Sequence, residues 1–160
     1  MTDTRAHALR ARYHELFQAP ELPVPVESIA EDLLGLHVEE AELDGVSGLL
    51  YPADRQIYVN AAEPKTRRRF TLAHELGHWV CQHLEGRVSP VYCRSEEIGV
   101  GEGRLREREA NVFAAELLMP RHAVEAAAPD GISSAAVAMG VSAQAMQWRL
   151  YTFGLAAPPS

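Results

Sequence analysis

Residues 69–80 read Arg69-Phe70-Thr71-Leu72-Ala73-His74-Glu75-Leu76-Gly77-His78-Trp79-Val80. This run contains the pattern His-Glu-x-x-His, which is typical of zinc sites when it lies on a helix. Side chains four positions apart on an α-helix lie one above the other, with Cβ atoms about 5–6 Å apart. His74 and His78 can therefore bind one metal ion between them.

The surrounding sequence predicts a helix that buries its metal-binding face. No proline interrupts residues 66–84. One stripe recurs at spacings of three and four: Phe70, Ala73, His74, Gly77, His78 and Cys81. A glycine inside a helix costs about 1 kcal/mol relative to alanine, so Gly77 indicates that another segment approaches the backbone closely at that position.

Glu75 follows His74 directly and is turned from it by about a quarter of the helix circumference. Its carboxylate is therefore expected beside the metal, within reach of a bound water. A general base that activates the metal-bound water must lie within reach of that water. We predict that Glu75 is the catalytic base.

A catalytic zinc ordinarily has three protein ligands and one open position, so a third ligand must come from elsewhere in the chain. Residues 105–119 have a helical pattern that ends at Pro120, and this helix offers Glu107 and Glu109. Steps of three, four, seven and eleven from Glu107 reach a mostly small and apolar row that suits packing against Gly77: Ala110, Asn111, Ala114 and Leu118.

The same steps from Glu109 reach Glu116, an acid that should face water. We therefore favour Glu107 as the third ligand, and Glu109 stays open as the alternative. Asn111, one turn beyond Glu107, is expected to hydrogen-bond a histidine ligand and orient it.

An oxyanion-stabilising donor is also expected near a catalytic metal. Tyr92, His83 and His122 are the candidates, and the sequence does not choose among them. We interpret Cys81, one turn beyond His78, as a small buried side chain rather than as a fourth ligand that would close the site. Cys93 is the other cysteine considered at the site, as a thiolate that would bind the zinc and inhibit the enzyme.

The rest of the sequence predicts a mostly helical chain with a small sheet. Helical patterns cover residues 2–18, 26–34, 105–119, 121–127, 133–139 and 142–153, and residues 96–103 read as a mobile loop. A strand falls within 36–43, and residues 46–51 and 56–60 read as a β-hairpin. We predict an α+β fold with a three-stranded antiparallel or mixed sheet. Its hairpin either covers the core or binds an extended peptide by strand addition.

Length and charge limit the function classes. A chain of 160 residues with 47% hydrophobic residues can form a core, and we expect a metallopeptidase domain over residues 1–125 with a helical extension over 126–160 packed on it. The extension resembles a helix-turn-helix with Ser142 as N-cap. Its last helix offers only Gln144, Gln147 and Arg149 to a groove, and the net charge is −7, so nucleic-acid binding is not expected.

The compartment follows from what the sequence lacks. The N-terminal segment has no apolar run of the kind that a signal peptide needs, and no stretch approaches the roughly 20 apolar residues of a membrane span. Two cysteines are too few for a disulfide framework. We expect a cytoplasmic protein without membrane contact, and nothing in the sequence predicts an oligomeric state.

Four segments in this order resemble the ImmA/IrrE family of zinc metallopeptidases: residues 57–60, 69–78, 92–94 and 107–120. The resemblance implies a zincin-like, gluzincin-like fold, with Zn²⁺ as cofactor and a glutamate as third ligand, which supports Glu107. The spacing of Glu107 and Asn111 is also similar to the Glu-x-x-x-Asp pattern of thermolysin-like enzymes. Family members known for activity cleave a repressor protein and so relieve transcriptional repression.

Three hypotheses follow. The leading one is an intracellular zinc endopeptidase that acts on a specific partner protein, a transcriptional repressor. The second is a catalytically idle zinc protein that binds a regulator through the hairpin and the helical tail, and the third is a DNA-binding regulator. Zinc content does not separate the first two, whereas proteolysis of a partner with a Glu75 control does.

Overall fold

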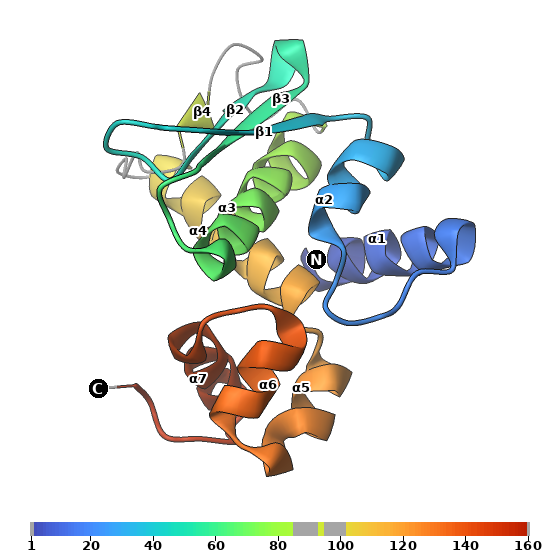
Figure 1. Ribbon diagram of the computed structural model, residues 1–160, viewed down its shortest axis with the longest axis vertical. Coiled ribbons are helices and arrows are strands. Elements are labelled where there is room, and N and C mark those ends of the chain that lie inside the picture. The colour runs from blue at the N-terminus through green and yellow to red at the C-terminus, as the bar shows by residue number, and fades with distance from the viewer. Residues whose placement is uncertain (1, 85–92, 95–101, 160) are drawn as a thin grey trace.

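The computed structural model describes residues 2–84, 93–94 and 102–159. The strands are β1 (His37–Ala41), β2 (Gly48–Tyr51), β3 (Gln56–Asn60) and β4 (Cys93–Arg94). The helices are α1 (Thr2–Phe17), α2 (Val26–Ser28), α3 (Lys65–His78), α4 (Glu102–Leu118), α5 (Arg121–Ala127), α6 (Ile132–Met139) and α7 (Ala143–Thr152). π-helical turns, Ile29–Leu33 and Trp79–His83, continue α2 and α3. Figure 1 shows the sheet on one side of α3 and the helices α5 to α7 at the opposite end of the molecule.

The sheet has the order β1-β3-β2-β4 and is mixed: β1, β2 and β3 are the three predicted strands, and the two-residue β4 adds a fourth that the sequence did not predict. β2 and β3 form the predicted antiparallel hairpin, with Gly48 opposite Val59, and β1 runs parallel to β3. Arg55 closes the hairpin turn in the left-handed conformation, with φ 53°. The short strand β4 pairs with β2 at Leu49 and Leu50. The edge of β2 at these two residues is therefore already occupied by β4, and a peptide cannot add as a strand there.

Helix α3 is the centre of the fold. Its residues from 71 to 78, and Trp79 after them, are all buried, so the helix is enclosed on all sides there rather than along one stripe. A Cβ added at Gly77 would lie 2.9 Å from the Cα of Ala110 on α4. This contact confirms the close backbone approach that the glycine predicted.

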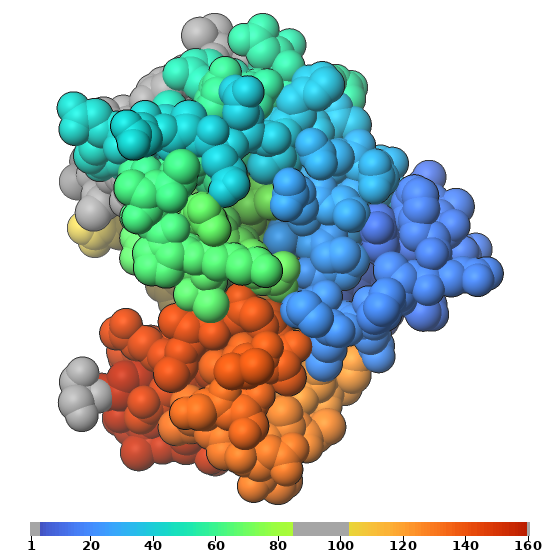
Figure 2. Space-filling model, viewed as in Figure 1, coloured from blue at the N-terminus to red at the C-terminus, as the bar shows by residue number. Residues whose placement is uncertain are grey.

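Arg69 connects α3 to both ends of the chain. Its Nη2 donates hydrogen bonds to the carbonyl oxygens of Val24 (3.0 Å) and Met139 (3.3 Å), and its Nε donates to that of Gly140 (3.0 Å). Gly140 ends α6 with φ +65°, and a Cβ there would lie 2.6 Å from the Arg69 Nε. In Figure 2 the C-terminal helices lie directly below the first turns of α3.

The predicted loop over residues 96–103 is wrong at its end, because α4 already begins at Glu102. The helix penalty of one glycine, about 1 kcal/mol, is too small for Gly103 to delay the helix start. Residues 96–101 lie outside the described residues. Within the described ranges, no helix combines the length and the apolar character that crossing a membrane requires.

Candidate metal centre

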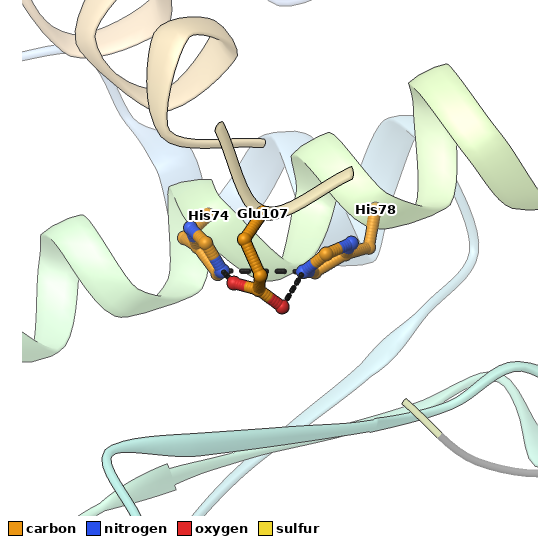
Figure 3. Close-up of side chains that lie close together, drawn as sticks. All are labelled: His74, His78 and Glu107. Atoms are coloured by element: carbon orange, nitrogen blue, oxygen red, sulfur yellow. Dashed lines mark hydrogen bonds and ion pairs between the residues drawn. The ribbon is translucent and has the colours of Figure 1, made fainter. Parts of the chain in front are cut away.

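Three side chains from two helices converge on one point (Figure 3). Glu107 of α4 lies against both imidazoles of α3: its Oε2 is 2.9 Å from His74 Nε2, and its Oε1 is 3.1 Å from His78 Nε2. The two Nε2 atoms are 3.2 Å apart. The ligand atoms of the three residues all lie within 4.8 Å of one another.

The other nitrogen of each imidazole is held by an amide. His74 Nδ1 lies 2.8 Å from Asn111 Oδ1, and His78 Nδ1 lies 2.7 Å from Gln82 Oε1. An amide oxygen only accepts, so each Nδ1 donates and carries the proton. The lone pairs of both Nε2 atoms therefore point at the place where the three side chains converge.

The orientation of the Gln82 amide is itself fixed from α4. Its Nε2 donates to the carbonyl oxygen of Arg106 at 2.7 Å and to Glu109 Oε1 at 3.2 Å. The amide oxygen must consequently face His78. Gln82 is fully buried, and it links the ligand helix α3 to the ligand helix α4.

This donor set fits a divalent metal ion. Two nitrogen lone pairs and a carboxylate facing one another repel unless a cation lies among them. Two nitrogens about 2.0–2.1 Å from a tetrahedral zinc would lie about 3.3 Å apart, close to the observed 3.2 Å. Burial raises the pKa of the Glu107 carboxyl, but the imidazoles of His74 and His78 in their protonated form outweigh burial through hydrogen bonds and charge and leave the pKa below its ordinary value, so the carboxylate is stable opposite positive charge.

Glu75 lies on the side of α3 that faces strand β2. Its side chain is fully buried, and a Cβ added at Gly48 would lie 3.5 Å from its Cγ and 2.4 Å from Thr71 Cγ2. Gly48 therefore makes the room in which Glu75 and Thr71 pack beneath the sheet. The role of Glu75 as a base stays a prediction.

The remaining predicted residues divide clearly. The structure brings Asn111 to His74, as predicted, whereas Glu109 hydrogen-bonds Gln82 instead of joining the ligand atoms. His122 has a side chain 62% exposed that pairs with Glu21 at 3.2 Å, and it does not line the cleft at the site.

Two further candidates and the cysteines have other surroundings. His83 stacks on Trp79 with ring centroids 4.4 Å apart, and Tyr92 lies outside the described residues. Cys81 is fully buried in the core, as expected of a small apolar side chain. The side chain of Cys93 also lies outside what the structure describes.

Sequence reasoning missed Gln82. The signal was present, because Gln82 follows His78 by four residues and so lies on the same helix face. What the sequence did not contain was the position of the Arg106 carbonyl that fixes the amide.

A cleft with a volume of about 1310 Å³ opens beside the three converging residues. His74 and Glu107 line one end of it. It continues between α3 and α4, past Phe70 and Ala115, and reaches Trp148 on α7. The cleft is thus long enough to hold an extended segment of another chain.

The chain is similar to known proteins in sequence and in fold. A family model described as the IrrE N-terminal-like domain matches residues 31–151. The radiation response metalloprotease IrrE of Deinococcus radiodurans is 30% identical over 116 residues, which cover 71% of this chain and 35% of that protein. The chain therefore spans about a third of the length of this relative.

A solved structure, a Mycobacterium tuberculosis transcriptional regulator, matches with a TM-score of 0.65 at 21% identity, over 91% of this chain and 45% of that one. This likeness shows a shared fold alone.

Proposed function

Because the chain belongs to the ImmA/IrrE family, with an IrrE N-terminal-like domain over residues 31–151, we propose that it is a zinc-dependent endopeptidase that cleaves a partner protein. One observation carries the proposal. The Nε2 atoms of His74 and His78 converge on the carboxylate of Glu107, and the Nδ1 atom of each ring donates to an amide oxygen. A curated relative that is a metalloprotease supports peptidase activity at the level of the family.

His74, His78 and Glu107 would hold the metal. Two imidazoles and one carboxylate are a ligand set of catalytic zinc sites, so we propose Zn²⁺. When bound, zinc supplies a Lewis acid that polarises a carbonyl and acidifies water.

The chain's own residues supply the rest. Asn111 and Gln82 hold each imidazole in the tautomer whose Nε2 is a ligand. The carboxylate of Glu75 accepts a proton from the attacking water and passes it to the leaving amine. The cleft between α3 and α4, which His74, Glu107 and Asn111 line, holds the peptide.

The partner that we propose is a transcriptional repressor in the cytoplasm. The resemblance to a family whose active members cleave a repressor supports this choice, and the low cysteine content fits a reducing compartment. The acidic net charge of −7 supports a protein substrate rather than nucleic acid.

The test combines zinc analysis with proteolysis. The wild type and a Glu75→Gln variant are purified, their zinc content is measured by mass spectrometry, and each is mixed with the regulator encoded beside the gene. We expect both to bind one zinc, the wild type to produce discrete fragments, and Glu75→Gln to be slower by about 10²–10⁴-fold, the usual contribution of a general base. Glu39→Gln, an exposed carboxyl on β1, is the matched control and should cleave like the wild type.

The outcomes separate the hypotheses. If the wild type binds zinc and the regulator but produces no fragments, the idle zinc protein is the correct description. Full activity of Glu75→Gln would exclude Glu75 as the base. If the freshly purified wild type contains no zinc and also binds none when zinc is added, the metal centre is excluded.

A further inference from the structure

The cleft does not end at the candidate metal centre. Its far wall is the outer face of α7, where Trp148 lines the same cleft as His74 and Glu107. Between them lie apolar side chains of α3 and α4, among them Phe70, Val112 and Ala115. One continuous surface therefore leads from the three converging residues to the C-terminal helices.

Large apolar side chains are exposed along this surface. Trp148 is 49% exposed and Val112 is 40% exposed. A half-exposed tryptophan on a flat surface needs no explanation, but in the wall of a concave cleft it is a typical anchor for a bound side chain. Burying it against a ligand would be favourable.

The position of Trp148 relative to the metal centre is fixed by the fold. Arg149 Nε donates to the carbonyl oxygen of Met119, just after the last residue of α4, at 3.0 Å, and its guanidinium lies 4.4 Å from the centre of the Phe153 ring. Ser142 caps the start of α7 by accepting from the Ala145 N–H at 3.1 Å. Helix α7 is thus attached to the helix that carries Glu107.

The length of the cleft sets a spacing along the substrate. From Glu107 to Met119, which also lines the cleft, α4 rises about 18 Å at about 1.5 Å per residue. An extended chain covers about 3.3 Å per residue. A side chain that reaches Trp148 therefore belongs to a residue about five positions from the scissile bond.

We propose that Trp148, at the end of the cleft away from the metal centre, forms a specificity subsite that binds a large apolar side chain of the protein substrate, about five positions from the bond that is cut. The proposal rests on the proposed peptidase function and deepens it. The occupant is a substrate segment, because this subsite and the metal centre are parts of one cleft. The C-terminal helices then select the substrate rather than only covering the core.

The first test measures binding without cleavage. Random peptides displayed on phage are selected on zinc-loaded Glu75→Gln protein, alone and combined with Trp148→Ala, Trp148→Phe or Val137→Ala. Val137 is an apolar residue of α6, 81% exposed and outside the cleft, and serves as the matched control. We expect the selected peptides to share one large apolar residue. The Trp148→Ala protein should bind them at least about tenfold more weakly, and the Trp148→Phe and Val137→Ala proteins should bind them almost normally.

The second test profiles cleavage of a proteome-derived peptide library by active enzyme with the same substitutions at Trp148 and Val137. We expect the wild type to prefer a large apolar residue about five positions from the cut, and Trp148→Ala to lose that preference while the residues next to the cut stay the same. Equal profiles of the wild type and Trp148→Ala would overturn the subsite and leave the peptidase intact. Peptide binding that depends on Trp148 without any cleavage would instead overturn the peptidase and leave the binding site.

A second copy of the chain is the competing occupant. If Trp148→Ala converts a dimer into a monomer in sedimentation experiments and changes neither peptide binding nor cleavage, the tryptophan belongs to a self-association surface and the subsite is wrong. Circular dichroism of every variant confirms that the fold is retained.

Discussion

The amide of Gln82, which lies outside the His-Glu-x-x-His pattern in the sequence, orients one of its histidines. Its oxygen accepts from His78 at 2.7 Å, and its nitrogen donates to the Arg106 carbonyl at 2.7 Å. One fully buried side chain thus fixes the tautomer of a ligand from α3 and the position of the backbone that carries Glu107. Hydrogen bonds of this kind are known to tune metal affinity.

We predict that Gln82→Met weakens zinc binding about 10–100-fold, the usual effect of losing a partner of a histidine ligand. Methionine has similar length but offers no amide, so His78 loses its acceptor and the Arg106 carbonyl loses its side-chain donor. Competition with a zinc chelator measures the affinity. Gln147→Met, on α7, is the control and should bind zinc like the wild type.

The same comparison tests the interpretation of Gln82. A Gln82→Met protein with unchanged zinc affinity but a lower melting temperature would show that the amide only joins the two helices. Loss of affinity with an unchanged far-UV spectrum supports the orienting role.

At the scale of single residues, the sequence predicted the side chains that local spacing determines. His74 and His78 follow from the helical repeat, and Asn111 follows from its place one turn beyond Glu107. The sequence favoured Glu107 but left Glu109 open, because the rotation of α4 about its axis depends on tertiary packing. The structure places Glu107 at the histidines and Glu109 at Gln82.

At the scale of elements, the packing of α3 on α4 determines how closely the ligands approach. Gly77 and Ala110 let the two backbones touch: a Cβ at Gly77 would lie 2.9 Å from the Cα and 3.0 Å from the carbonyl oxygen of Ala110. Glu107 lies one turn before Ala110 on the same helix. Any displacement of α4 at Ala110 therefore moves Glu107 away from the histidines.

We predict that Gly77→Ala destabilises the protein by about 1–3 kcal/mol, the range expected for overpacking, although alanine is the better helix former by about 1 kcal/mol. Zinc affinity should fall as well, because α4 must move. Thermal unfolding and chelator competition measure the two effects, and each kcal/mol corresponds to about 2–4 °C in a chain of this size.

Gly103→Ala is the matched control for this prediction. Gly103 also lies in a helix, but the nearest atom to an added Cβ is Arg106 Nη2 at 4.0 Å. The substitution should leave stability unchanged or raise it by up to about 1 kcal/mol, with normal zinc affinity. A Gly77→Ala protein as stable as Gly103→Ala would contradict the close packing.

The elements were more predictable than their arrangement. The α+β, zincin-like domain, the β2–β3 hairpin and the long helices are confirmed, because periodicity and turn residues are local signals. The parallel pairing of β1 with β3 and the π-helical turn after α3 were not predicted. Both depend on contacts between segments distant in sequence.

At the scale of the whole molecule, Arg69 holds together segments that no single element connects. It lies on α3 five residues before His74, and its guanidinium donates to a carbonyl near the N-terminal helices, Val24, and to two at the end of α6, Met139 and Gly140. Burial lowers the pKa of this guanidinium, but arginine ordinarily titrates so far above neutrality that the side chain stays charged. Arg69 thus ties the end of α6 directly to the ligand helix α3, whereas Arg149 ties α7 to the end of α4.

We predict that Arg69→Met lowers the free energy of unfolding by about 2–4 kcal/mol, because methionine keeps the aliphatic part of the side chain but removes the guanidinium that donates to three carbonyl groups. Arg68→Met is the control on the neighbouring residue: Arg68 pairs with Glu40 at 2.8 Å, with side chains 28% and 53% exposed, and such a surface pair contributes at most about 1 kcal/mol. Urea unfolding followed by circular dichroism measures both. If α7 selects the substrate as proposed, Arg69→Met should also weaken Trp148-dependent peptide binding while zinc affinity stays normal, since the metal ligands lie on α3 and α4. Equal losses of stability in the two variants would show that Arg69 contributes no more than an ordinary surface arginine.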